Sequence, residues 1–223
     1  MAATMKHLFL PVLLLLGTAF AAEESAPKKP DAPKEVILFD GKTLDDWEMV
    51  DVGGSGIVEL VDGEMLIHQG EGVSGAVYKK ADKLPTTNYE ITLEAKRLQG
   101  VDFFVGLTVP VGDLKTCCTF ICGGWGGAVT GISSINNFDA SENNTSTYQR
   151  YEDDKWYRIR LRVTPHNLSA WVGDEQVVDE DIVDKKISVR AGPIESYLPL
   201  SLTNFNTTTA IRNIKLTPVA PQK

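Results

Sequence analysis

Alternation of apolar and polar residues is the feature that most constrains the fold of this chain. Apolar side chains occupy every second position over residues 88–97, and the same period recurs over 156–163. A period of two places the apolar side chains on one face of an extended strand, whereas a helix needs a period near 3.6. No window of twelve residues after residue 22 shows a convincing helical period. The chain therefore reads as β-structure almost throughout.

Turn signals separate the expected strands. Asp62-Gly63 lies between two apolar runs, and Pro165-His166-Asn167 separates the strand over 156–163 from apolar positions at 168, 170 and 172. Such spacing is typical of antiparallel hairpins. A last strand is expected over 211–216. Many short strands with half-buried alternation indicate an all-β antiparallel β-sandwich rather than a parallel sheet.

The N-terminal segment belongs to a different class. Residues 1–22 combine a basic start, a short apolar run and an Ala-x-Ala site at Ala19 and Ala21, which is typical of a secretory signal peptide. The apolar run is shorter than the roughly 20 residues that a membrane span needs. Residues 23–34 contain three prolines and no large apolar side chain, as in flexible linkers. We therefore expect one domain over 35–219 in a secreted or periplasmic protein without a membrane span.

Charge narrows the choice of partners. The chain has 30 acidic against 22 basic residues, a formal net charge of −8, and 43% hydrophobic residues. Nucleic-acid binding requires a basic surface that neutralises phosphates. The composition is that of an ordinary globular protein and argues against a nucleic-acid partner.

Four stretches, in order along the chain, resemble the family called domain of unknown function 1080, or the 3-keto-disaccharide hydrolase domain. They are LFDGKTLDDW over 38–47, VDGEML over 61–66, KWYRIR over 155–160 and AIRNIKL over 210–216. The resemblance implies a jelly roll of the concanavalin A-like lectin and glucanase type, in exported proteins that act on sugars. The central segment, 99–127, differs from the acidic central segment of that family.

Carboxyl groups decide whether such a protein is an enzyme. Glycoside hydrolysis commonly uses two carboxyl groups about 5–10 Å apart, but no Glu-x-Asp-x-x-Glu string occurs here. Glu90 and Glu94 share a strand face with Lys96, which favours a solvated outer face. Asp102 is expected to begin a strand with Phe104 and Gly106 on its face and so to line a groove.

The candidate catalytic residue is therefore Asp102, as acid or base. Arg97, across the expected hairpin, is its predicted charge partner in the substrate-binding set. Arg190, Asn204, Asn137 and Tyr148 are polar residues that would suit the same cleft, although no spacing places them there.

The most unusual string is Gly123-Gly124-Trp125-Gly126-Gly127. Four glycines let the backbone bend tightly and leave an indole open, and an open indole can stack on the apolar face of a sugar. Trp125 is the second predicted substrate-binding residue. The alternative is a bulged strand with Trp125 packed in the core.

Other groups have simpler interpretations. Trp156 with Arg158, Arg160 and Arg162 forms a basic stripe that cation–π stacking on a solvated face explains, in preference to an acidic sugar ligand. No histidine or cysteine spacing indicates zinc, and no cofactor is predicted; a structural Ca²⁺ site suits such sandwiches but has no readable signature.

The three cysteines, Cys117, Cys118 and Cys122, are expected to be buried free thiols, because positions 118 and 122 lie about 13 Å apart along a strand.

Two functions remain open on the sequence. The leading hypothesis is a glycoside hydrolase-like enzyme, and the alternative is a non-catalytic carbohydrate-binding module of the same fold. A third interpretation is a structural domain in which the glycine-rich string only shapes a bulge.

Overall fold

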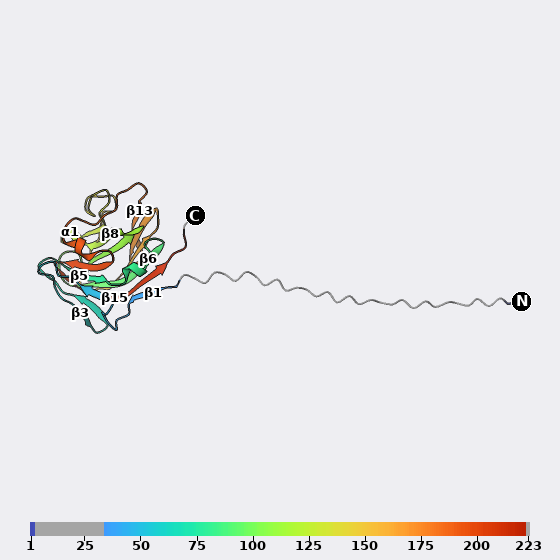
Figure 1. The fold of residues 1–223 in the computed structure, drawn as a ribbon, viewed down its shortest axis with the longest axis horizontal. Helices are drawn as coiled ribbons and strands as arrows, with labels where there is room; N and C mark the ends of the chain where they lie inside the picture. The colour runs from blue at the N-terminus through green and yellow to red at the C-terminus, as the bar shows by residue number, and fades with distance from the viewer. Residues whose placement is uncertain (3–33, 222–223) are drawn as a thin grey trace. The chain divides into compact units, whose positions relative to one another are not determined.

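A computed structural model describes residues 1–2 and 34–221 of the chain. The predicted signal peptide and linker lie almost entirely outside the described residues. Residues 34–221 form one compact unit, and two β-sheets pack face to face within it (Figure 1).

The first sheet has eight strands, all of whose pairings are antiparallel. Its order is β13 (Glu175–Asp181), β12 (Asn167–Val172), β11 (Tyr157–Val163), β6 (Tyr89–Gly100), β15 (Thr207–Pro218), β4 (Glu64–Ile67) and β3 (Val58–Val61), with β1 (Val36–Phe39) also paired to β15.

The second sheet has seven strands and is likewise antiparallel. Its order is β10 (Thr147–Tyr148), β9 (Val129–Ser133), β8 (Asp113–Gly123), β7 (Val105–Val111), β14 (Ser201–Phe205), β5 (Val73–Tyr78) and β2 (Trp47–Met49). Strands distant in sequence are neighbours in both sheets, as in a jelly roll, and the predicted antiparallel sandwich is confirmed.

Helical structure is limited to short turns. They are η1 (Ala81–Lys83), η2 (Pro193–Tyr197) and the four-residue element α1 (Gly124–Gly127). None of the helices among residues 1–2 and 34–221 is long and apolar enough to cross a membrane.

The alternation over 88–97 predicts the burial of β6 correctly. Tyr89, Ile91, Leu93 and Ala95 are all at most 1% exposed and belong to the core between the sheets. Burying one face of a strand while hydrating the other is what an alternating sequence achieves. The hairpin at Asp62-Gly63 is also confirmed: both residues have positive φ, 51° and 83°, as a two-residue hairpin turn requires.

The outer face of the eight-stranded sheet carries the predicted basic stripe. The guanidinium of Arg162 pairs with Glu90 at 2.8 Å, and that of Arg212 pairs with Glu94 at 2.7 Å, which confirms that both glutamates lie on a solvated face. Cation–π contacts also occur as predicted, although the partners differ.

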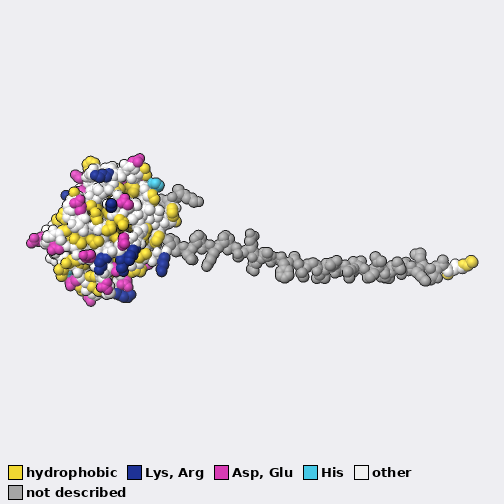
Figure 2. Space-filling model, viewed as in Figure 1, with side chains coloured by type: hydrophobic (Ala, Val, Ile, Leu, Met, Phe, Trp, Pro, Cys, Tyr) yellow, Lys and Arg dark blue, Asp and Glu magenta, His cyan; other side chains and the backbone are white. Residues whose placement is uncertain are grey.

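The arginine over Trp156 is Arg212, at 3.9 Å, and Arg160 lies over Trp171, at 3.9 Å. Basic side chains on the face shown in Figure 2 are accompanied by acidic ones. The paired charges explain the stripe without a ligand.

All three cysteines are free and buried, as predicted. Cys118 and Cys122 belong to the core between the sheets, whereas Cys117 lies on the opposite face of β8 near the carbonyl of Pro199.

Candidate functional site

The glycine-rich string forms a left-handed turn between β8 and β9. Gly123, Gly126 and Gly127 have φ of 80°, 86° and 105°, and Trp125 itself has φ 51° and ψ 51°. A tryptophan in this region is sterically costly, whereas glycine is not. The turn lifts the indole out of the sheet and leaves Trp125 41% exposed, so the alternative of a core tryptophan is wrong.

Asp102 fastens this turn to the neighbouring loop. Its Oδ2 accepts the backbone N–H of Gly126 at 3.0 Å, and its Oδ1 accepts the N–H of Phe103 at 2.7 Å. Both oxygens are thus engaged by the backbone, yet a carboxylate offers about four lone-pair sites. Each oxygen therefore retains the capacity to accept a further hydrogen bond.

The predicted neighbours of Asp102 need correction. Strand β7 begins at Val105 rather than at Asp102, so the residues before it do not alternate as a strand. Phe104 is fully buried against Tyr151, with ring centroids 4.9 Å apart. It is Phe103 that lies beside Asp102 on the open side, where it stacks against Phe205 at 6.0 Å.

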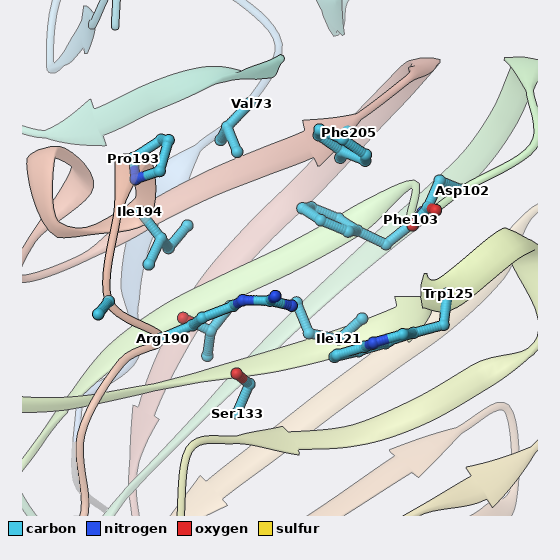
Figure 3. Close-up of a pocket in the computed structure, with 12 residues that line it drawn as sticks. Val73, Asp102, Phe103, Ile121, Trp125, Ser133, Arg190, Pro193, Ile194 and Phe205 are labelled. Carbon is cyan, nitrogen blue, oxygen red and sulfur yellow. The ribbon is translucent and has the colours of Figure 1, made fainter. Parts of the chain in front are cut away.

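Asp102 and Trp125 line one cavity of about 440 Å³ on the outer face of the seven-stranded sheet (Figure 3). Three groups of residues enclose it. The sheet contributes Val73, Thr119, Ile121, Ser133 and Phe205; the two turns contribute Asp102, Phe103 and Trp125; and the segment 188–200, here called the strap, contributes Arg190, Ala191, Pro193 and Ile194.

The strap is held over the sheet by buried contacts. The hydroxyl of Tyr197 donates to the carbonyls of Val50 and Val73 at 2.9 and 3.1 Å. Burial raises the pKa of Tyr197, which keeps the hydroxyl protonated as a donor. Ser188 and Ser134 exchange backbone hydrogen bonds at the other end of the strap. These anchors fix the position of Arg190 between them.

Arg190 reaches from the strap across the cavity toward Trp125 (Figure 3). Its guanidinium carbon is 5.9 Å from the indole centroid, and its Nη1 lies 3.3 Å from Oδ2 of Asp139. Asp139 also accepts hydrogen bonds from the hydroxyls of Ser133 and Ser134, at 2.8 and 3.1 Å. The guanidinium of Arg190 thus lines the cavity, and its orientation is set by the carboxylate of Asp139.

Sequence reasoning did not find Asp139, and it named Arg190 only as one of several polar residues. No motif marks either position, because their contact depends on the strap crossing the sheet.

The other predicted residues lie elsewhere. Arg97 does not pair with Asp102: its Nε donates to Asp153 at 2.6 Å and its Nη2 to the carbonyl of Tyr151 at 2.9 Å. It lines a second hollow beyond the Trp125 turn, together with Tyr148. Asn204 is fully buried between the sheets, where its Nδ2 donates to the carbonyl of Ile67, so it does not face the cleft. Asn137 contacts Lys186 on the surface.

The cavity combines aromatic walls with few polar groups. Of the described residues that line it, Asp102 is the one carboxylate and Arg190 the one cation. Across the described part of the chain, no group of three or more His, Cys, Asp or Glu side chains is arranged to hold a metal ion. Such a site suits a neutral ligand with an apolar face and several hydroxyl groups.

Comparisons with known proteins agree with the fold. A family model described as the 3-keto-alpha-glucoside-1,2-lyase-like domain matches residues 34–217. No curated protein matches the chain.

Three solved structures illustrate the structural likeness. A Crh5 transglycosylase in complex with NAG aligns with a TM-score of 0.57 and 10% identity, covering 85% of this chain and 84% of that one. A β-1,3-1,4-glucanase (lichenase) from a mouse hindgut metagenome aligns at 0.53 and 10%, covering 85% and 100%. A Bacillus licheniformis β-glucanase aligns at 0.53 and 10%, covering 86% and 100%. At these identities the likeness is one of fold.

Proposed function

Because the chain belongs to the family of 3-keto-alpha-glucoside-1,2-lyase-like domains, we propose that it binds a glycoside in the cavity that Trp125 and Arg190 line. The observation that carries this function is the indole of Trp125, which the left-handed turn holds open beside the cavity. An indole offers a flat apolar surface for the C–H face of a pyranose. Arg190 supplies donors that fix the orientation of the sugar hydroxyls.

The same cavity supports bond cleavage as a second candidate function. A pair of carboxyl groups, as in ordinary glycoside hydrolysis, is not present among the lining residues, which contain Asp102 alone. Elimination from a 3-keto glucoside needs only one base. The keto group acidifies the hydrogen at C2, so a carboxylate can take that proton, after which the C1–O bond breaks and a C1–C2 double bond forms.

In this reaction the roles of the cavity residues differ. Asp102 would accept the proton from C2 on a lone pair that Gly126 and Phe103 leave free. Arg190 would stabilise the enolate oxygen that develops at C3. The departing oxygen takes up the proton that Asp102 removed from C2, directly or through water, which restores the carboxylate; the products are an unsaturated keto sugar and an alcohol or second sugar.

We infer export as well. The signal-like features of residues 1–22 support a secreted or periplasmic location. Sequencing the N-terminus of the protein recovered from its native host tests this, because cleavage after Ala21 or Ala22 is expected.

Binding is tested by calorimetry of the purified protein with disaccharides and their 3-keto derivatives. Trp125→Ala is expected to weaken binding about tenfold or more, equivalent to about 1.4 kcal/mol. Trp171→Ala removes an indole from the opposite sheet and serves as the matched control. Equal affinities for the wild type and Trp125→Ala would overturn the site.

Catalysis is tested separately by product analysis. If the protein cleaves 3-keto glycosides, Asp102→Asn is expected to abolish turnover while 3-keto ligands still bind. Turnover that survives Asp102→Asn would remove Asp102 from the mechanism. If the wild type binds sugars saturably but does not cleave them, the alternative function, a carbohydrate-binding module, is supported.

A further inference from the structure

A second hollow adjoins the cavity on the far side of the Trp125 turn. It measures about 710 Å³ and is lined by Arg97, Val101, Gly126, Tyr148 and Arg150, among others. The two spaces share a dividing wall: Val101 and Gly126 line the hollow, while their chain neighbours Asp102 and Trp125 line the cavity. The hydrogen bond from Gly126 to Asp102 joins the two sides of this wall.

The part of this wall formed by Gly126 has no side chain. A Cβ built on Gly126 would meet no atom within 4 Å, so the backbone there borders open space. A ligand that extends out of the cavity can therefore pass close to the backbone at this point.

Tyr148 provides an aromatic surface within the hollow. It lies on β10, the two-residue edge strand of the seven-stranded sheet, and is 76% exposed. Its ring has no stacking or cation–π partner among the described residues. A single exposed tyrosine is unremarkable in itself, but this one borders a hollow that also contains hydrogen-bond donors.

Those donors come from two arginines. The side chain of Arg97 is only 11% exposed; its Nε and Nη2 are engaged by Asp153 and Tyr151, but no acceptor among the described residues engages Nη1. The absence of a side chain at Gly127 keeps the space beside Nη1 open, since a Cβ there would lie 3.5 Å from it. Arg150 is exposed and has no ion-pair partner in the described part of the chain. The Nη1 of Arg97, which Asp153 and Tyr151 hold in place, and the exposed guanidinium of Arg150 can both donate hydrogen bonds to an incoming hydroxyl oxygen.

We propose that this hollow is a subsite for a further sugar unit, so that the ligand is an oligosaccharide crossing the wall between Trp125 and Tyr148. Tyr148 stacks on the added unit, and Arg97 and Arg150 donate hydrogen bonds to its hydroxyls. The inference rests on the proposed function, because it extends the sugar site at Trp125.

A chain-length series tests the subsite. Calorimetry of the full chain is performed with glucose and with α-1,4- and β-1,3/1,4-linked gluco-oligosaccharides of two to four units. Affinity is expected to increase roughly threefold to tenfold when the added unit reaches the hollow, as for one aromatic contact of about 0.5–1.5 kcal/mol. Tyr148→Ala is expected to remove most of this gain, whereas Tyr148→Phe retains it. Trp171→Ala controls for loss of an aromatic side chain elsewhere.

The outcomes separate the two proposals. Binding that does not increase with chain length, or an increase that survives both Tyr148→Ala and Arg150→Ala, would overturn the subsite while the site at Trp125 stands. Absence of binding by the wild type both to every sugar in the series and to the 3-keto disaccharides would overturn the site at Trp125, and the subsite with it. Because Tyr148 and Arg150 are exposed, loss of folding does not complicate their variants.

Discussion

The guanidinium carbon of Arg190 lies 5.9 Å from the centroid of the Trp125 indole. This distance is within the range of a cation–π contact, and it joins the strap to the left-handed turn across the mouth of the cavity. Both side chains remain partly exposed, at 62% for Arg190 and 41% for Trp125. A ligand in the cavity beside this pair would therefore contact an aromatic face and a cation together.

Asp139 is expected to act on the ligand through Arg190. Asp139→Asn removes the charge that holds the guanidinium at 3.3 Å, so sugar affinity is expected to fall by roughly 3- to 10-fold, the equivalent of one ordinary hydrogen bond of about 0.5–1.5 kcal/mol. The readout is a double-mutant cycle with Arg190→Ala, measured by calorimetry. If Asp139 positions Arg190, its substitution has little further effect once Arg190 is absent. Additive effects of the two substitutions would show that Asp139 acts independently.

The left-handed backbone conformation of Trp125 is expected to lower the free energy of unfolding of the protein. Its φ of 51° favours glycine, so Trp125→Gly should unfold at a higher temperature than Trp125→Ala, by about 1 kcal/mol in the free energy of unfolding or roughly 2–4 °C. Both variants are expected to lose sugar binding. Thermal unfolding followed by circular dichroism measures the difference. Equal melting temperatures for the two variants would mean that the turn relaxes to another backbone conformation.

Sequence analysis predicted most of the fold because burial on one face leaves a readable pattern. Strand β6 alternates between core and solvent, and its apolar positions were identified from spacing alone. Strands β7 and β9, by contrast, are buried along their whole length. They have the core on one face and the strap and loops on the other, so alternation does not distinguish their two faces.

The site was predicted less completely, for a related reason. Trp125 carried a local signal, because glycines on both sides of a tryptophan have few structural uses. Arg190 and Asp139 meet only when the strap crosses the sheet, and nothing near either residue in the sequence indicates that crossing. The prediction that Phe104 shares a face with Asp102 was wrong because a turn precedes β7. Alternation assumes an extended backbone, and the turn interrupts it.

The cysteines are expected to be unreactive in the native protein. Burial raises the pKa of Cys117 to about 11 and that of Cys122 to about 12, and it also raises the pKa of Cys118. Because the thiolate is the reactive form, a pKa above the ordinary value lowers reactivity at pH 8, here by about a hundredfold or more relative to a free thiol near 8.5. A thiol-reactive dye should label the native protein slowly at pH 8, faster as the pH approaches 10, and rapidly at three sites after unfolding in guanidinium.

Cys117→Ser identifies the thiol that reacts first, since Cys117 alone lies outside the core between the sheets. Rapid labelling of the native protein at pH 8 would contradict the burial of the thiols. Fewer than three reactive groups after unfolding would contradict their free state.

Gly75 is expected to be required for the pairing of β5 with β14 beneath the cavity. A Cβ at this position would lie 2.2 Å from the carbonyl oxygen of Leu202 and 2.8 Å from Cα of Thr203, both backbone atoms of β14. Gly75→Ala must therefore push the strands apart, which typically costs about 1–3 kcal/mol and would lower the melting temperature by roughly 3–10 °C. Gly72→Ala is the matched control, because a Cβ there meets no atom within 4 Å, and it should change stability by less than about 0.5 kcal/mol. Since β5 and β14 also carry Val73 and Phe205 of the cavity, Gly75→Ala is expected to weaken sugar binding in the protein that remains folded. Equal stability of the two variants would mean that β14 accommodates a methyl group without moving, and the floor of the cavity would then be more compliant than its close backbone contacts imply.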